Sequence, residues 1–454
     1  MSRSYLPLEV LEYIVDFHHD DTDALQTCSL TCQSLLPVTR LHLFRCIVLK
    51  RVPDCLRFLS ALETSASTQA SIANYVRDIR LPFIAFVSGT RGGNKGLRYE
   101  LVRRVLHHLR HLTRLRLYAF DWMGFMDLLR AEAGDGGLRA AMAAFFHFPE
   151  LRELLIDNLV SLSSHELTLL ISIFPRLSRL ELQRIIAPLA PGSWLPPPEP
   201  PHDPRDLLSA DELGTHLRTI VVDFDRRSQS IIARVVERLL SPPFHIQLKH
   251  IEWETCPVDS RHGINDIVFL KGALRTSQST LETLKVSFAE DSWLRDLDLS
   301  RHKRLTHLTF VFRRGESLER ESDFCLDELP SFLSSLPSDR LQEVHLHLEA
   351  DDQFGVVGDW TDWPRLDKAL ASLHKRCSSL IVTFHFYGVL PLGFVKPDVV
   401  GPLKERIPYA LAAGMRVASV LSAMTYCPVG DGSQPLEMEV IVEPEEHHWL
   451  TLTT

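Results

Sequence analysis

The sequence lacks the cysteine patterns of disulfide-rich and zinc-binding proteins. Its 454 residues include 8 cysteines, none of which form a Cys-x-x-Cys pair, and the last four lie far apart in the chain. Secreted mini-proteins and zinc ribbons depend on closely spaced cysteines, so both classes are excluded. We expect reduced and mostly buried thiols, as in proteins of the cytoplasm or nucleus.

An excess of positive charge and a long apolar run are also missing. The formal net charge is -9, whereas general nucleic-acid binding needs clustered lysine and arginine. The longest late apolar stretch, 409–424, is interrupted by Gly414 and Arg416 and is too short to span a bilayer. The first residues carry no apolar segment typical of a secretory signal. We therefore expect an intracellular protein that binds neither nucleic acid nor membrane.

Motifs for cofactors and catalysis are absent as well. The segment 88–96 is rich in glycine, but Asn94 precedes its lysine and Gly96 follows it, so it departs from a phosphate-binding loop. Neither a Gly-x-Ser-x-Gly elbow nor a Gly-x-Gly-x-x-Gly fingerprint occurs. His107 and His111 would share a face only if a helix continued between them. The sequence therefore predicts no catalytic residue, no cofactor and no metal site; an enzyme with dispersed residues remains the third alternative.

Residues 1–50 predict a small module of three helices. Pro7 suits the first turn of a helix, and Leu8, Leu11, Ile14 and Val15 follow at helical spacing. The acidic residues 20–23 supply N-caps for a second helix, and residues 38–44 form a third amphipathic segment. So short a module cannot bury a large core, and its surplus apolar faces need a partner or a following domain.

These residues resemble an F-box, in particular those of fungal F-box proteins. The resemblance rests on Leu-Pro-Leu-Glu at 6–9, on the helix 28–36 with its cysteines, and on Leu-Phe-Arg at 43–45. Leu35 and Leu36 stand where the family often has tryptophan. The resemblance implies docking to the Skp adaptor of a Skp–cullin–F-box ubiquitin ligase. It implies the following residues at or behind that interface: Leu6, Pro7, Leu8, Glu9, Ile14, Leu30, Cys32 and Leu35. The alternative is that these residues only pack the N-terminal helices onto the rest of the chain.

One pattern, apolar-x-x-apolar-x-apolar, recurs from residue 76 onward. Its last three positions alternate, as in a short strand with one buried face. The copies start at these residues: Val76, Leu112, Leu151, Leu177, Leu217, Leu248, Leu281, Leu305 and Leu341. Helical patterns lie between several copies, at 98–109, 164–174, 230–240 and 331–336. Regular alternation of strand and helix predicts a right-handed βα solenoid.

This body resembles a leucine-rich-repeat domain of the long-repeat kind. It departs from the full motif because the asparagine or cysteine expected after each strand is replaced by Phe120, Leu159, Ile185 or Ala289. We therefore expect an irregular solenoid, with a compact parallel α/β domain as the alternative. A proline-rich stretch at about 187–206 predicts an extended insertion or, alternatively, a partner-binding segment.

The fold class expected is α/β, with an F-box-like helical module at 1–50, a leucine-rich-repeat-like solenoid at 51–390 and a C-terminal cap with a loosely held tail at 391–454. The expected function is that of a non-catalytic substrate receptor, which binds a Skp-family adaptor of a cullin ligase and an unknown target protein. The alternative is a repeat scaffold without a ligase. Target contacts are expected from polar positions of the strands: Arg116, Arg152, Glu181, Arg218, Glu252, Lys285, His307 and His345.

Overall fold

The structure is a computed structural model, and the chain divides into two compact units. Unit 1 comprises Met1–Leu217 and Ser230–Phe244, and unit 2 comprises Arg218–Gln229 and His245–Thr454. The structure describes these residues: 7–31, 33–66, 71–82, 95–119, 122–133, 137–159, 163–185, 216–224, 229–241, 244, 246–255, 266–288, 292–312, 326–336, 339–349, 361–390, 400–426, 437–438 and 448–450.

Unit 1 begins with helices α1 (Leu8–Phe17), α2 (Thr22–Thr31) and α3 (Leu36–Arg45), with a 3-10 turn at Gln33–Leu35. Pro7 is the N-cap of α1, and an oxygen of the Asp21 carboxylate accepts a hydrogen bond from Ala24 N at the start of α2. Val15, Leu25 and Leu35 form the core of these helices. This small core leaves much apolar surface uncovered.

The rest of unit 1 alternates strands with helices. Neighbouring strands from β1 to β5 pair in parallel. The strands are β1 (Cys46–Val48), β2 (Asp78–Pro82), β3 (Arg114–Tyr118), β4 (Glu153–Asp157) and β5 (Arg179–Gln183). The helices are α4 (Val52–Ala66), α6 (Lys95–His107), α7 (Trp122–Ala133), α8 (Leu138–Phe145), α9 (Ser164–Ser172) and α10 (Gln229–Leu240), with a 3-10 turn at Ile72–Asn74.

Unit 2 repeats this architecture. Its strands from β6 to β12 pair in parallel, and β13 and β14 pair antiparallel with β12. The strands are β6 (Thr219–Phe224), β7 (His250–Thr255), β8 (Thr283–Phe288), β9 (His307–Phe312), β10 (Glu343–Glu349), β11 (Ile381–Leu390), β12 (Arg416–Tyr426), β13 (Glu437–Met438) and β14 (His448–Leu450). The helices are α11 (Asp266–Thr276), α12 (Ser292–Asp296), α13 (Leu329–Ser335), α14 (Trp363–Arg376), α15 (Val400–Arg406) and α16 (Pro408–Ala412).

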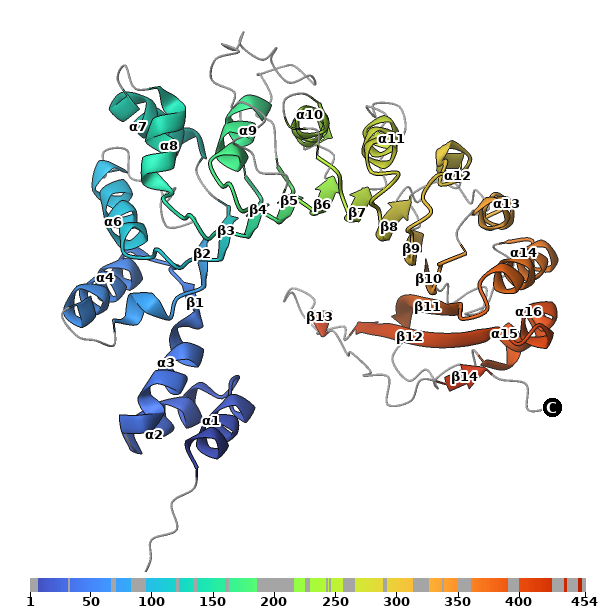
Figure 1. Cartoon of the computed structure of the whole chain (residues 1–454), viewed down its shortest axis with the longest axis horizontal. Coiled ribbons are helices and arrows are strands. Elements are labelled where there is room, and N and C mark those ends of the chain that lie inside the picture. Colours follow the sequence, from blue (N-terminus) through green and yellow to red (C-terminus); the bar gives the residue numbers. More distant parts are fainter. Residues whose placement is uncertain are drawn as a thin grey trace, which may run out of the picture. The chain divides into compact units, whose positions relative to one another are not determined.

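Alternating side chains explain why each sheet has two different faces. In β3, Leu115 and Leu117 are fully buried while Arg114 and Arg116 point the other way. Within each unit the helices lie on one side of the strands, so they cover the apolar face (Figure 1). The opposite face, called here the strand face of its unit, carries the polar side chains.

Main-chain hydrogen bonds join each repeat to the next in a constant way. The Arg77 carbonyl oxygen accepts hydrogen bonds from the backbone N–H groups of Thr113 and Arg114, at the start of β3. The same arrangement recurs at later strand starts, where the accepting carbonyls belong to Thr113, Arg152, Arg218, Lys249, Glu282 and Thr306. These bonds do not depend on side-chain identity, so sequences as different as those of the two units form the same junction.

Buried apolar residues occupy the positions where an asparagine ladder was expected. Leu159 and Ile185, two residues after the ends of β4 and β5, are fully buried. The residues before them, Asn158 and Arg184, have positive φ angles of 51° and 47°, so each turn bends sharply and directs the next side chain inward. At these two positions, packing of apolar side chains replaces the side-chain hydrogen bonds of an asparagine ladder. Phe120 and Ala289 lie outside the described residues.

The alternation predicted from the sequence is confirmed as a mixed α/β repeat fold of the solenoid kind. Each of the nine predicted strands is present as β2 to β10, and the helical patterns correspond to α6, α9, α10 and α13. The prediction missed β1, β11, β12 and the short strands β13 and β14. The proline-rich stretch 187–206, the glycine-rich segment 88–94 and most of the C-terminal tail lie outside the described residues. Among the described helices, none is long and apolar enough to cross a bilayer.

Candidate functional site

A stripe of exposed apolar side chains runs along α1 and is called here the α1 stripe. It consists of Val10, Tyr13, Ile14 and Phe17, whose exposed fractions are 41%, 73%, 43% and 77%. Because they are three or four residues apart, they lie on one side of the helix in successive turns. At the last turn of α2, Leu30 is 87% exposed. Exposed apolar side chains gathered on one helix face make this stripe a candidate contact surface for another protein.

The residues assigned to adaptor binding by resemblance fall into three groups. Pro7, Glu9, Ile14 and Leu30 are exposed. Leu35 is buried with Val15 and Leu25, so it supports the helices from behind. Leu6, Cys32 and the side chain of Leu8 lie outside the described residues.

Sequence reasoning missed three members of the α1 stripe, namely Val10, Tyr13 and Phe17. Their spacing with Ile14 was visible in the sequence. However, only the fold shows that Leu11 and Val15 supply the buried side of α1, which leaves the others exposed.

The strand face of unit 1 carries a network of arginines and carboxylates. Arg114 Nε donates a hydrogen bond to Glu153 at 2.6 Å, and another nitrogen of Arg114 lies 3.6 Å from Asp78. Arg116 pairs with the same Asp78 carboxylate at 3.0 Å. The hydrogen bond with Glu153 is the main cause that raises the pKa of Arg114. Asp78 is only 7% exposed, so this network is partly shielded from water.

The network continues over β4 and β5, where a hollow of about 300 Å³ opens between the side chains. Its lining includes Arg116, Leu155, Arg179 and Glu181, and the last two pair at 2.5 Å. Beyond the end of β5, Arg184 forms two hydrogen bonds with the Asp157 carboxylate, at 2.8 and 2.6 Å. Among the described residues of this face, then, opposite charges are largely matched with each other.

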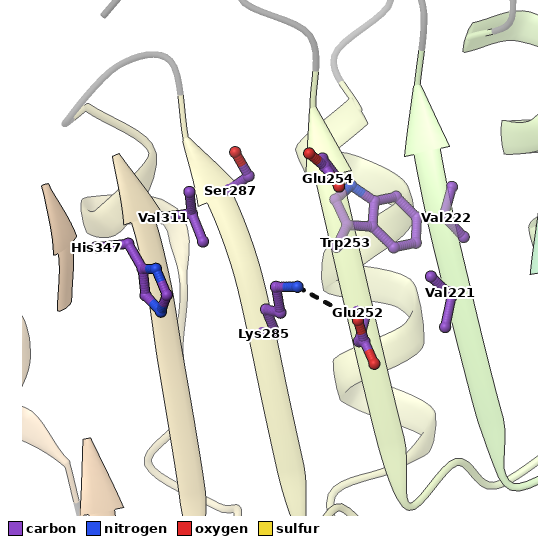
Figure 2. A pocket seen from close by; sticks show the side chains of 9 residues that line it. All are labelled: Val221, Val222, Glu252, Trp253, Glu254, Lys285, Ser287, Val311 and His347. Atoms are coloured by element: carbon purple, nitrogen blue, oxygen red, sulfur yellow. Dashed lines mark ion pairs between the residues drawn. The ribbon is translucent and has the colours of Figure 1, made fainter. Parts of the chain in front are cut away.

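The strand face of unit 2 is hollowed over β6 to β10. A cavity of about 290 Å³ is lined by polar and apolar side chains of neighbouring strands (Figure 2). Glu252 and Glu254 stand on β7, and His347 stands on β10. Between them, Lys285 pairs with Glu252 at 3.5 Å. The remaining lining residues are Val221, Val222, Trp253, Ser287 and Val311.

Four histidines and one glutamate, called here the imidazole cluster, lie on β9, β10 and β11: His307, Glu343, His345, His347 and His385. One of them, His347, also lines the cavity. His345 Nδ1 lies 3.0 Å from His385 Nε2, and His345 Nε2 lies 3.2 Å from the Glu343 carboxylate. The rings of His347 and His385 stack, with centroids 4.1 Å apart. His307 Nε2 lies 3.7 Å from Glu343.

One member of the imidazole cluster, His347, has a clearly lowered pKa. Burial, followed by the nearby His345 and Lys285, lowers the pKa of His347 from 6.5 to about 4. His347 is therefore neutral at physiological pH. Among the described residues, no group of three or more histidine, cysteine, aspartate or glutamate side chains is placed to hold a metal ion.

The strand faces contain most of the residues expected to bind a target. Arg116, Glu181, Glu252, Lys285, His307 and His345 are on the strand faces of their units. Arg152 and Arg218 are exposed one residue before β4 and β6. Sequence reasoning missed His385 because it did not predict β11, although Leu380-x-Val382 at the start of that strand follows the same alternation as the other repeats.

Comparisons with known proteins add little to this geometry. No protein-family model and no curated protein matches the chain. Among solved structures, the crystal structure of the Rad7 and Elc1 complex in yeast contains a similar chain, with 14% sequence identity and a TM-score of 0.37. The match covers 90% of this chain and 92% of that chain.

Proposed function

We propose that this chain is a substrate-receptor subunit of a Skp–cullin–F-box ubiquitin ligase. The observation that carries the proposal is the α1 stripe, an apolar helix face in the module whose sequence resembles an F-box. The stripe would bind the Skp-family adaptor, and the strand faces of the repeats would bind a target protein. The chain itself would carry out no bond chemistry, because its contribution is to hold the target near a separate enzyme.

The physical argument for adaptor docking is the removal of apolar surface from water. Fully burying a large apolar side chain is worth roughly 1.5–3 kcal/mol, and Tyr13 and Phe17 are 73% and 77% exposed. The core formed by Val15, Leu25 and Leu35 is too small to stabilise the helices strongly by itself. A partner that covers the stripe would therefore stabilise the helices as well as bind them.

The test is co-purification with the Skp adaptor in the presence of cullin. We expect the intact chain to bring the adaptor with it and the double variant Tyr13→Asp and Phe17→Asp to lose it. Both side chains are largely exposed, so the variant keeps the thermal stability of the parent. The matched control is Glu12→Gln, an exposed polar residue of the same helix that lies outside the stripe.

Two results would count against the proposal. If the intact, folded chain does not bind the adaptor, the proposed ligase function is wrong. It would favour the alternative, a repeat scaffold that binds a partner through its strand faces without a ligase. Adaptor binding that survives in the double variant would show that the α1 stripe is not the contact.

A further inference from the structure

Positive charge is concentrated in one part of unit 1. Residues 40–118 contain 15 lysines and arginines and 4 aspartates and glutamates, whereas the whole chain contains 49 and 58 of these residues. A local excess of this size in a chain of net charge -9 indicates a surface that attracts anions. Several of these cations are held in ion pairs within the protein, so the structure is needed to locate the others.

One row of residues lies directly before the strands of unit 1 and is called here the junction row: Arg45, Arg77, Thr113, Arg152 and Ser178. Main-chain hydrogen bonds place each member beside the next. Arg77 N donates to the Arg45 carbonyl oxygen at 3.0 Å, and Thr113 N donates to that of Arg77 at 2.9 Å. Arg152 N donates to the Thr113 carbonyl oxygen at 2.9 Å, and Ser178 N donates to that of Arg152 at 2.8 Å. The row therefore crosses unit 1 from β1 to β5 and carries three arginines.

The three arginines of the junction row have no counter-charge of their own. Arg45 and Arg152 are exposed, and Arg77 is partly exposed. Within the part of the chain that the structure describes, no aspartate or glutamate forms an ion pair with any of them. The carboxylates nearest to them in sequence are already paired with other residues: Asp78 and Glu153 with Arg114, and Glu150 with His111.

The fold does not require arginine at these positions. Thr113 and Ser178 occupy the same row, and their hydroxyl groups donate hydrogen bonds to the carbonyl oxygens of Arg77 and Arg152, at 3.1 Å each. Of the three guanidinium groups, only that of Arg77 forms a hydrogen bond with the described residues, to the adjacent Val76 carbonyl oxygen at 3.1 Å. The hydroxyl groups therefore support the junctions, and the guanidinium groups are available for other contacts.

The corresponding row of unit 2 is neutralised within the protein. Lys249 and Glu282 occupy neighbouring positions of that row and pair at 2.7 Å. Arg304 also pairs with Glu282, at 3.2 Å. The hydrogen bond from Lys249 is the main cause that lowers the pKa of Glu282. The same scaffold can therefore satisfy the charges of this edge internally, and the junction row of unit 1 does not.

We propose that the junction row of unit 1 binds an acidic segment of a partner protein, whose carboxylates pair with Arg45, Arg77 and Arg152. A guanidinium group binds a carboxylate through two parallel hydrogen bonds, which fix the position of the ligand as well as its charge. Only the description of this partner as a ligase target rests on the proposed function; the binding itself does not.

The spacing of the arginines sets the length of the segment. Neighbouring strands lie about 4.8 Å apart, so Arg45 and Arg152, three positions apart in the row, are separated by roughly 14 Å. An extended chain covers this distance in about four residues at 3.3–3.6 Å each. A short run of aspartate or glutamate therefore reaches all three arginines. A nucleic acid fits less well, because outside residues 40–118 the chain carries an excess of negative charge that a long polyanion would meet.

The experiment is fluorescence anisotropy of a labelled peptide of about eight glutamates with the full-length chain, with a glutamine peptide of the same length as the neutral probe. We expect the glutamate peptide alone to bind, and its binding to weaken when the salt concentration rises from about 0.05 to about 0.3 M, because salt screens exposed charges. The variant Arg77→Gln with Arg152→Gln should weaken binding about fivefold, since each exposed ion pair contributes a few-fold. Thr113→Arg fills the gap between these two arginines and should strengthen binding about twofold.

The matched control is Arg275→Gln, an exposed arginine of α11 in unit 2, which should leave the binding unchanged. If the parent chain does not bind the glutamate peptide, or if the double variant binds it as tightly as the parent at equal thermal stability, the proposal is wrong. Tighter binding of a single-stranded DNA of about 20 nucleotides than of the glutamate peptide would assign the row to nucleic acid and would also overturn the proposal. The adaptor takes no part in this assay, so a chain that fails to bind the adaptor can still pass it, and the reverse also holds.

Discussion

The strand faces of the two units share one architecture but carry different chemistry. In unit 1 the charges are guanidinium and carboxylate groups, and Asp78 alone pairs with both Arg114 and Arg116. In unit 2 the region over β9 to β11 carries imidazoles instead, which contact each other and Glu343. Guanidinium and carboxylate groups keep their charge near neutral pH, whereas His347 is neutral there because burial lowers its pKa to about 4.

This difference shows that a repeat fold leaves the function of its exposed face open. In unit 1 the paired charges satisfy each other, so the face contributes to the stability of the unit and offers little unpaired charge to a ligand. In unit 2 the stability of the face depends on the protonation of His347, whose pKa burial lowers to about 4. We therefore expect substitutions on the two faces to have opposite profiles, with a large effect on stability in unit 1 and a large dependence on pH in unit 2.

The largest effect is expected from Asp78→Asn in unit 1. Among the described residues, Asp78 is the carboxylate that pairs with Arg116, and it is 7% exposed. Its neutralisation leaves a partly buried guanidinium without its counter-charge, at a cost of about 2 kcal/mol. Urea unfolding measures this loss.

Glu343→Gln in unit 2 is the matched control, because the Glu343 side chain is 41% exposed and its loss should cost less than about 0.5 kcal/mol. Equal losses for the two variants would contradict the contrast between the faces.

A smaller effect is expected from the pH dependence of unit 2. The pKa of His347 is lowered from 6.5 to about 4 in the fold, so folding excludes a proton that the unfolded chain binds. His347 has no effect on the free energy of unfolding above pH 6.5, and this free energy falls as the pH drops from 6.5 towards 4. Because His347 is partly exposed, we expect a loss of about 1–2 kcal/mol over this window.

Urea unfolding of the parent and of His347→Asn across this range is the measurement. The variant should have a flatter profile than the parent, and parallel profiles would show that His347 is not responsible.

The smallest effect is expected at Cys46, on the strand face of unit 1 opposite Asp78. Burial, and after it the charge of Asp78, raises the pKa of this thiol. Cys46 should therefore react more slowly with iodoacetamide at about pH 8 than an ordinary exposed thiol, because the thiolate is the reactive form. Asp78→Asn should accelerate the reaction.

Mass spectrometry of the modified peptides measures these reaction rates. Cys55 is the internal reference, since it is buried and its pKa is raised to about 11; it should stay unmodified in the folded protein. If the Asp78 substitution left the reaction rate of Cys46 unchanged, the charge of Asp78 would not be a cause of the raised pKa of Cys46.

The strands of this fold could be predicted because each repeat places three apolar residues in a pattern that only a half-buried strand explains. Leu112, Leu115 and Leu117 around β3 are an example, and all three are fully buried. β1 was missed although Phe44, Ile47 and Leu49 follow the same pattern, because the preceding residues had been assigned to a helix. Boundaries between a helix and a short strand depend on tertiary packing, which one sequence does not reveal.

The candidate surfaces were harder to predict than the fold. The alternation placed Arg116, Glu252, Lys285 and His345 correctly on the strand faces, because residues two apart in a strand share a face. The alternation does not predict which residues of neighbouring strands contact each other. His345 and His385 are 40 positions apart in the sequence and contact each other because of the register between β10 and β11. The α1 stripe could not be predicted for a similar reason. The neighbouring helices determine which side of a short helix is buried.

The main-chain junction between repeats has a consequence for how such a protein can evolve. At seven of the junctions one carbonyl oxygen accepts two backbone N–H groups, as at Arg77 and Arg218. Heritable changes to the side chains of a strand face therefore leave the connection between repeats in place. A lineage can replace arginine by histidine, or one binding preference by another, while the inherited scaffold persists.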